Sequence, residues 1–275
     1  MQKYHFISGL PRSGSTLLSS ILQQNPRFTA GISDPIIDIL KSAISTVSIS
    51  AGMNLRVPND KLVEILKSIV SAYYKTDNEV CFNTSRLWTA NTQLLKQMYP
   101  YSKIIVCIRD VPWILDSFER LNSNNPLSVK PVYNHQSLNT VYERSMMLMG
   151  EYPNHPGFVN TPLLAAKQAV YSADTDMICV VDYEKLTTDP LTTMKQIYEF
   201  IEEPWYDHDF ENVEYSYDEF DSAVKIAGLH TVRPKVEFIP HRPVIPEDIW
   251  VKYMDSSFWK VEGFDRIKRR INWID

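Results

Sequence analysis

The sequence predicts an α/β fold of three layers, in which a mostly parallel sheet lies between helices and carries a P-loop-like phosphate-binding turn. Short apolar, β-branched runs alternate along the 275 residues with longer segments whose apolar residues recur every three or four positions. This alternation is typical of parallel strands joined by right-handed helical crossovers. The first run, Lys3–Ser8, leads directly into a glycine-containing turn and an apolar helix. We therefore expect a single domain over residues 1–275.

Four runs are predicted to be buried strands because they are short, apolar and rich in β-branched residues. They are Lys3–Ser8, Val80–Thr84, Lys103–Ile108 and Met177–Asp182. The cysteines Cys81, Cys107 and Cys179 lie in the last three runs, are odd in number and show no CxxC spacing. We interpret them as small core residues in a reducing compartment rather than as disulfides or metal ligands.

The segments between and after these strands are predicted to be helices from their helical periodicity, and several begin with Pro or a capping residue. They are Ser15–Gln24, Pro35–Ser48, Lys61–Lys75, Thr89–Met98, Pro112–Leu121, His135–Met149, Pro162–Ala173 and Pro190–Ile201. The stretch from Gly228 to Pro246 contains four prolines, which exclude one continuous helix or a central strand. It is predicted to be a long, shaped loop, and loops of this length often carry function.

Composition and charge limit the possible partners. With 44% hydrophobic and 22% charged residues, the chain has the balance of a globular protein. Its formal net charge of −5 argues against nucleic acid, because a protein that neutralises a phosphate backbone shows a basic surplus. The sequence contains neither a secretory leader pattern nor a run of about 18 apolar residues. We expect no membrane span and a cytoplasmic location, and the oligomeric state is left open.

The turn after the first strand fits the phosphate-loop frame G-x-x-x-x-G-K-[S/T], with Gly9, Gly14 and Thr16 in register and Ser15 in place of the lysine. Backbone N–H groups of such a turn and the positive end of the following helix form an anion site. Without the lysine, nucleoside triphosphate hydrolysis loses a main charge clamp. A plain strand-to-helix turn is the structural alternative. Arg12 inside the turn and the hydroxyl residues after it favour anion binding.

The segment Pro11–Leu18, with the sequence PRSGSTLL, resembles the 5′-phosphosulfate loop of sulfotransferases that use 3′-phosphoadenosine 5′-phosphosulfate (PAPS). The Pro-Arg-Ser-Gly form is similar to that of tyrosylprotein sulfotransferases and of compact bacterial members. A second motif follows, since the strand Lys103–Ile108 is succeeded by Arg109, and Ser117 comes eight residues later on the next predicted helix. In the family this arginine and serine bind the 3′-phosphate, and an arginine can grip phosphate oxygens bidentately.

Further stretches extend the resemblance over most of the chain. Asn83–Thr89, which contains Arg86, resembles the segment that brings a cation or hydroxyl toward the phosphosulfate. Val181–Leu186 resembles the Tyr-Glu-x-Leu segment near which an aromatic ring meets adenine, and Gly228–Lys235 resembles the late basic loop over the nucleotide. The resemblance implies donor contacts from Arg12, Ser13, Gly14, Ser15, Thr16, Arg109, Ser117, Tyr183, His230, Arg233 and Lys235.

The function implied by the resemblance is sulfuryl transfer from PAPS to a hydroxyl-bearing small molecule or peptide, with release of 3′-phosphoadenosine 5′-phosphate (PAP) and no metal. Two alternatives stay open: a kinase-like phosphoryl-transfer enzyme and a non-catalytic nucleotide-binding module. Neither Asp110 nor Asp182 is a convincing strand-end partner for magnesium. The chain departs from steroid and phenol sulfotransferases, because its turn carries Arg12 instead of lysine and residues 83–89 contain no histidine base.

The expected catalytic residues are Arg12, Arg86 and Asp34. Arg12 and the backbone amides of the turn would stabilise the charge that develops on the departing phosphate, and the resemblance implies that Arg86 brings a further cation toward the phosphosulfate. Asp34 lies about where tyrosylprotein sulfotransferases place a catalytic glutamate, and we expect it to be the general base at the mouth of the turn. Capping of the following helix is the alternative role, because Asp34 precedes Pro35. His230 and Asp38 are the next candidates for the base.

Overall fold

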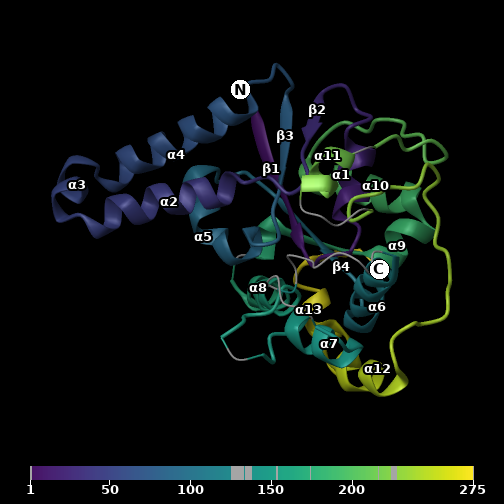
Figure 1. The fold of residues 1–275 in the computed structure, drawn as a ribbon. Coiled ribbons are helices and arrows are strands. Elements are labelled where there is room, and N and C mark those ends of the chain that lie inside the picture. Colours follow the sequence, from purple (N-terminus) through teal and green to yellow (C-terminus); the bar gives the residue numbers. More distant parts are fainter. Residues whose placement is uncertain are drawn as a thin grey trace.

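The computed structural model describes residues 2–124, 133, 138–152, 154–173, 175–215, 217–223 and 228–274. Its centre is a six-stranded sheet in the order β2-β3-β1-β4-β5-β6, and every described pairing is parallel (Figure 1). The strands are β1 Lys3–Gly9, β2 Phe28–Ala30, β3 Val80–Thr84, β4 Ile104–Ile108, β5 Ile178–Asp182 and β6 Asn272–Ile274. The predicted α/β class with a parallel sheet is confirmed.

The predicted strands are confirmed with boundaries within one residue, whereas β2 and β6 were not predicted. Each of these two is three residues long and lies at an edge of the sheet. Three residues are too few to show the alternation of apolar and polar side chains that is typical of a strand. These two strands are therefore recognised only by their pairing with a neighbouring strand. Phe28 of β2, for example, pairs with Val80 of β3.

Helices surround the sheet, and every predicted helix is present at least in part. They are α1 Ser15–Leu22, α2 Ile36–Ile49, α3 Ala51–Arg56, α4 Asn59–Tyr74, α5 Thr92–Met98, α6 Val111–Asn124, α7 Val141–Leu148, α8 Asn160–Tyr171, α9 Tyr183–Thr188, α10 Pro190–Ile201, α11 Asp218–Ala223, α12 Glu247–Met254 and α13 Asp265–Lys268. The predicted segment Thr89–Met98 is divided between a 3₁₀ turn, Trp88–Asn91, and α5. Helices α3, α9, α11, α12 and α13 were not predicted.

The start of α7 differs from the prediction. The helix begins at Val141 rather than near His135, because Thr140 and Glu143 form a capping box there. The Thr140 side chain accepts a hydrogen bond from the Glu143 N–H, and the Glu143 carboxylate accepts one from the Thr140 N–H. Residues 134–137, which include the predicted start, lie outside the described residues.

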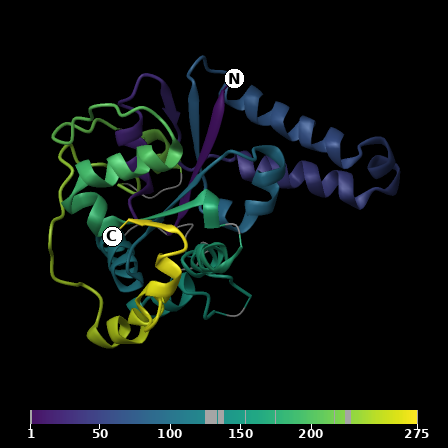
Figure 2. The same cartoon turned by 180° about the vertical axis from the view of Figure 1, so that it is seen from behind.

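The side chains of each strand alternate between two apolar layers, as the pleat of a β-strand requires. In β4, Ile104 and Val106 face a core that also includes residues of α2, α4, α5, α6, α8 and α12. Ile105 and Cys107 face the other core, which is covered by α1 and α10. Figures 1 and 2 show these layers from opposite sides. The three cysteines are buried and unpaired, as predicted.

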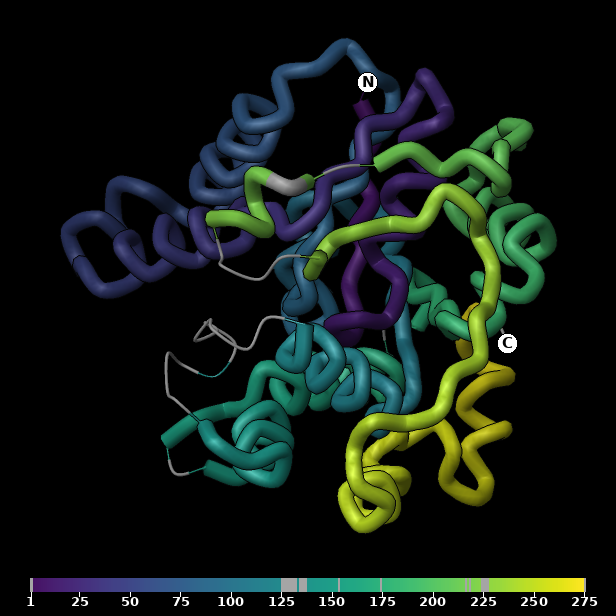
Figure 3. Tube along the Cα trace, turned by 45° about the vertical axis from the view of Figure 1, so that its right-hand side comes forward, coloured from purple at the N-terminus to yellow at the C-terminus, as the bar shows by residue number. Residues whose placement is uncertain are grey.

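Two features lie outside this three-layer body. Helices α2 and α4 run side by side away from the sheet, with α3 at their far end (Figures 1 and 2). The segment from residue 228 to 246 contains neither helix nor strand, which confirms the predicted long loop, and it passes along the outside of the molecule (Figure 3). Within the described ranges, none of the helices is long and apolar enough to cross a membrane.

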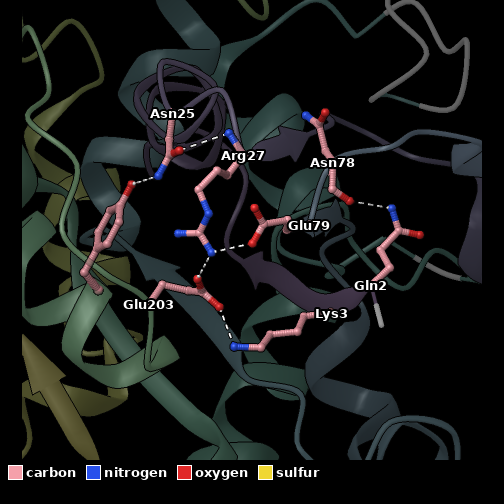
Figure 4. Close-up of polar contacts among 8 residues, drawn as sticks. Gln2, Lys3, Asn25, Arg27, Asn78, Glu79 and Glu203 are labelled. Atoms are coloured by element: carbon pink, nitrogen blue, oxygen red, sulfur yellow. Dashed lines mark hydrogen bonds and ion pairs between the residues drawn. The ribbon is translucent and has the colours of Figure 1, made fainter.

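The amino ends of the strands, called here the amino edge of the sheet, carry charged side chains that pair with one another (Figure 4). The Lys3 ammonium lies 2.6 Å from one carboxylate oxygen of Glu203, and the Arg27 guanidinium lies 2.8 Å from the other. Arg27 also contacts Glu79 at 2.8 Å. The Glu203 side chain is only 1% exposed, so its negative charge is stabilised by these two cations rather than by water.

Candidate active site

The turn between β1 and α1 has the backbone of a phosphate loop. Arg12 and Gly14 both have positive φ, 59° and 91°, and Gly14 is the N-cap of α1. A Cβ atom at Gly14 would lie 2.9 Å from the ring of Tyr183, so the position requires glycine both for its φ and for its close approach to α9. The free N–H groups of the first turn of α1 therefore lie beside the turn, where they favour an anion.

The hydroxyl of Ser13 faces the protein interior. Ser13 is 1% exposed, and its side chain donates to the carbonyl of Leu10 and lies 3.0 Å from that of Cys107. The side chain therefore fastens the turn to β4. Ser13 is absent from the cavity lining, whereas Gly14, Ser15 and Thr16 line the cavity beside the turn.

Two adjoining cavities lie at the carboxyl edge of the sheet. The first measures about 540 Å³ and the second about 930 Å³, and both are lined by Arg12, Arg109, Tyr183 and Arg233. Arg12 follows β1, Arg109 follows β4 and Tyr183 follows β5. Strands β3 and β4 lie on opposite sides of β1, so the order of the strands reverses at β1. Ligands of open α/β sheets bind at such a reversal of strand order.

Four arginines line the first cavity, and the three that are partly buried, Arg12, Arg86 and Arg109, are called here the site arginines. Among the described residues, none of them forms an ion pair with a carboxylate. Arg12 Nε donates to Ser117 Oγ at 3.0 Å, and its Nη1 donates to the carbonyl of Leu229. Burial lowers the pKa of Arg12 to about 10 and that of Arg86 to about 10, because the charged form is desolvated.

Aromatic rings cover the other two site arginines. The guanidinium of Arg86 lies 3.9 Å from the ring centre of Phe158, and that of Arg109 lies 4.4 Å from the ring centre of Tyr183. Arg109 also donates to the carbonyl of Arg12 at 3.3 Å. Burial lowers the pKa of Arg109. An aromatic face attracts a cation but does not neutralise it, so these guanidinium groups remain available to an anion.

The remaining residues predicted to contact the donor line one or both cavities and differ in exposure and in their charged partners. Ser117 lines the second cavity, and Tyr183 borders both under the Arg109 guanidinium. Arg233 is exposed and lines both cavities. Lys235 lines the first cavity but its ammonium is 2.9 Å from the carboxylate of Glu211, so this exposed cation has a partner.

Asp34 lies in the first cavity, where three donors of the chain surround its carboxylate. Oδ1 accepts from the Tyr73 hydroxyl at 3.0 Å, while Oδ2 accepts from the Thr84 N–H at 3.0 Å and the Tyr74 hydroxyl at 3.4 Å. Burial raises the pKa of Asp34, and these hydrogen bonds oppose the rise. The capping alternative is wrong, because Pro35 is the N-cap of α2 and that cap has no side-chain hydrogen bond.

His230 lies in the same cavity and is oriented by a buried carboxylate. Its Nδ1 is 2.6 Å from Asp221 Oδ1, its backbone N–H donates to Asp221 Oδ2 at 2.9 Å, and its Nε2 is 3.3 Å from Ser33 Oγ. Burial lowers the pKa of His230, while Asp221 opposes this. The neutral ring with Nδ1–H toward Asp221 leaves the Nε2 lone pair facing the Ser33 hydroxyl.

Sequence reasoning did not find Asp221, Tyr73 or Tyr74. The two tyrosines end α4, about forty positions after Asp34, and an aromatic pair in a helix is otherwise typical of core packing. Asp221 lies in α11, a short helix that was not predicted. In the described part of the chain, no group of three or more His, Cys, Asp and Glu side chains is arranged to hold a metal ion.

Comparison with known proteins identifies the family of this chain. A family model described as the sulfotransferase family matches residues 5–207. Protein-tyrosine sulfotransferase A of Caenorhabditis elegans is 24% identical over 276 residues, covering 91% of this chain, and the chain spans 64% of the length of that relative. A sulfotransferase structure from Alicyclobacillus acidocaldarius has a TM-score of 0.53 at 13% identity, over 98% of this chain and 94% of that one. The sulfotransferase domain of the curacin biosynthetic pathway has a TM-score of 0.47 at 14% identity, over 99% and 98%. The chain belongs to the sulfotransferase family.

Proposed function

We propose that this chain transfers a sulfuryl group from PAPS to the hydroxyl of a small molecule or peptide and releases PAP. The observation that carries the proposal is the set of site arginines around two joined cavities, with no carboxylate partner in the described chain. A buried cation without a counter-charge is costly, and an anionic substrate offsets that cost when it binds. PAPS carries its charge at two separated points, the 5′-phosphosulfate and the 3′-phosphate.

Each end of PAPS has a proposed set of contacts. Arg12 and the N–H groups of Gly14, Ser15 and Thr16 bind the phosphosulfate, with Ser13 holding the turn in shape. Arg109 and Ser117 bind the 3′-phosphate, in line with the position of Ser117 in the second cavity. Residues that border the cavities complete the donor site: Tyr183, His230, Arg233 and Lys235.

The proposed reaction is an in-line displacement at sulfur. The acceptor oxygen forms a new bond to sulfur while the bond from sulfur to the bridging phosphate oxygen breaks, and the electron pair leaves with PAP. Arg12 and Arg86 stabilise the charge that grows on the departing phosphate, since preorganised donors act most strongly where charge develops. Asp34 takes the proton of the acceptor hydroxyl, and Oδ1 still has a free lone pair for it.

His230 is the second candidate for the base, because Asp221 orients it and a hydroxyl already contacts its Nε2. The variants Asp34→Asn and His230→Gln separate the two assignments, since each keeps its polar shape but loses basicity. We expect kcat to fall by about 10²- to 10⁴-fold in Asp34→Asn, which is the usual contribution of a general base, and less in His230→Gln. The opposite order would assign the proton to His230.

The decisive test of the function is transfer of label from [³⁵S]PAPS to a panel of hydroxylated metabolites, sugars and tyrosine peptides. A phosphoryl-transfer enzyme would instead turn over magnesium ATP, and a binding module would retain PAP and transfer nothing. We expect turnover to continue in EDTA, because the site arginines supply the charge that a metal supplies in phosphoryl transfer. Loss of turnover that magnesium restores would contradict this.

Two further parts of the proposal concern setting. We propose that residues 1–275 act as one domain and that the protein works in the cytoplasm, where three unpaired thiols stay reduced. Nucleic acid is not among the proposed partners, since the net charge is −5.

A further inference from the structure

A chain of three hydrogen bonds, one buried and two partly buried, runs from the core to Asp34. Trp88 Nε1 donates to Asn83 Oδ1 at 2.7 Å, and Asn83 Nδ2 donates to the Tyr74 hydroxyl at 2.7 Å. The Tyr74 hydroxyl in turn donates to Asp34 Oδ2 at 3.4 Å. Trp88 is 0% exposed and Asn83 is 1% exposed, so water does not compete for the contact between them, and the two contacts of Tyr74 are partly buried.

The direction of this chain is fixed by chemistry at its buried end. An indole N–H is a donor only, so the amide oxygen of Asn83 must face Trp88 and the amide nitrogen must face Tyr74. An amide nitrogen also only donates, so the Tyr74 oxygen accepts from it and its own proton is directed to Asp34. The Thr84 N–H is a second donor to the same oxygen.

These contacts make the two oxygens of Asp34 unequal. Oδ2 receives two donors of fixed direction and has no room for a proton of its own. Oδ1 receives only the hydroxyl of Tyr73, a residue that is 42% exposed and whose proton can rotate away. A Cβ at Gly31 would lie 2.5 Å from Oδ2 and 2.6 Å from Oδ1, so the main chain covers one face of the whole carboxylate and the difference between its oxygens comes from the donors alone.

We propose that Tyr74 and Asn83 are positioning residues that hold Asp34 Oδ2 as a permanent acceptor and so confine proton uptake to Oδ1. The inference rests on the proposed function, in which Asp34 is the base. Neither residue is among those that line the two cavities, and Trp88 sets the direction of the hydrogen bonds of both. The consequence is a carboxylate with one defined basic atom instead of two that exchange by rotation.

Other titratable and charged groups also face Asp34 or share its cavity. Those from the neighbouring elements are Asp38 on α2, Tyr73 and Tyr74 on α4 and Tyr215 before α11, and those on the cavity wall are Arg12, Arg86, Arg109, Tyr183, His230, Arg233, Lys235 and Glu237. Burial is the main cause that raises the pKa of Asp34, and the hydrogen bond from Tyr74 lowers it. Removing the Tyr74 hydroxyl therefore raises this pKa, and the base is lost at a higher pH as the solution is acidified.

The test is the pH dependence of kcat/KM for sulfuryl transfer in wild type and in Tyr74→Phe. We expect the acid limb to move upward by about one pH unit, because a hydrogen bond to a charged group has been removed. Asn83→Asp should move it in the same direction, since a carboxylate at 83 accepts from both Trp88 and Tyr74 and turns the Tyr74 proton away from Asp34.

Tyr99→Phe is the matched control. Tyr99 is also a partly buried tyrosine, but its hydroxyl has no hydrogen-bond partner among the described residues, so its acid limb should equal that of wild type. An unmoved limb in Tyr74→Phe, or an equal shift in Tyr99→Phe, would overturn the inference. Full activity in Asp34→Asn would overturn the assignment of the base instead, and a wild type that transfers no sulfuryl group would overturn the proposed function.

Discussion

The arginines at the amino edge and at the carboxyl edge of the sheet, where the strands begin and end, have different hydrogen-bond partners. At the amino edge, Arg27 contacts Glu79 and Glu203, and these partners raise its pKa (Figure 4). At the carboxyl edge, Arg12 contacts a hydroxyl and a carbonyl, and burial lowers its pKa to about 10. The same side chain is stabilised by the fold in one place and left under-stabilised in the other. The difference supports the proposal that arginines paired with carboxylates serve the structure, whereas arginines without such partners bind an anionic ligand.

The largest expected effect of replacing these arginines is on kcat. We expect Arg12→Ala to lower kcat for transfer from PAPS by about 10²- to 10³-fold, the usual loss when one preorganised donor to a developing charge is removed. Arg27→Ala is the control at the other edge and should leave kcat within about threefold of wild type, since Arg27 lies away from the cavities. Initial rates with saturating PAPS measure both, and equal losses would abolish the distinction.

The next effect is on nucleotide selectivity. We expect wild type to bind PAP more tightly than AMP, and Arg109→Ala to weaken PAP by about 10- to 100-fold while hardly changing AMP, because a hydrogen bond to a charged group contributes about 1.5–3 kcal/mol. Calorimetric titration with both nucleotides measures this. Equal affinity of the wild type for PAP and AMP would contradict the proposed role of Arg109 and Ser117.

A smaller effect, on stability, is expected at the amino edge. Glu203→Gln keeps the shape of the side chain but removes the charge that Lys3 and Arg27 share. We expect the free energy of unfolding to fall by about 2 kcal/mol, within the range for hydrogen bonds to charged groups. Urea unfolding followed by circular dichroism gives the value, and an unchanged midpoint would show that the network contributes nothing.

The smallest expected effect is a change in the free energy of unfolding that has opposite signs for arginines at the two edges. Arg86→Met removes a desolvated cation and should raise the free energy of unfolding by about 1 kcal/mol, since its contact with the Phe158 ring offsets only part of the desolvation. Arg27→Met should lower it by about the same amount, because ion pairs are lost. Paired urea titrations compare them. Destabilisation by Arg86→Met would assign that arginine to the fold.

The parts of the molecule that the sequence predicted are those encoded by neighbouring residues. The turn from Gly9 to Thr16 could be predicted because strand, turn and helix follow one another without interruption. The edge strands could not, because three residues carry no period. The inward hydroxyl of Ser13 was also hidden, since its partner carbonyl of Cys107 belongs to β4.

The surroundings of Asp34 and His230 could not be predicted for a related reason. Asp34 meets Tyr73 and Tyr74 only because α2 and α4 pack side by side, and nothing near Asp34 in sequence specifies that return. His230 and Asp221 are only nine positions apart, yet the helix that contains Asp221 is too short for periodicity. The sequence therefore predicted structure where the interacting residues are close together in the chain. It did not predict hydrogen-bond partners that only the folding of the chain brings together.

The contact of Arg12 with the Leu229 carbonyl has a consequence for the order of events during turnover. Arg12 donates to Leu229 and to Ser117 Oγ, and an incoming anion competes for the same N–H groups. In the proposed function, an anion that displaces these internal acceptors binds with an affinity reduced by the stability of the internal contacts. Leu229 lies next to His230, so the internal contact of Arg12 ends beside that candidate base. The Arg12 guanidinium therefore joins the phosphate turn to the late loop, and under the proposed function donor binding would act on both.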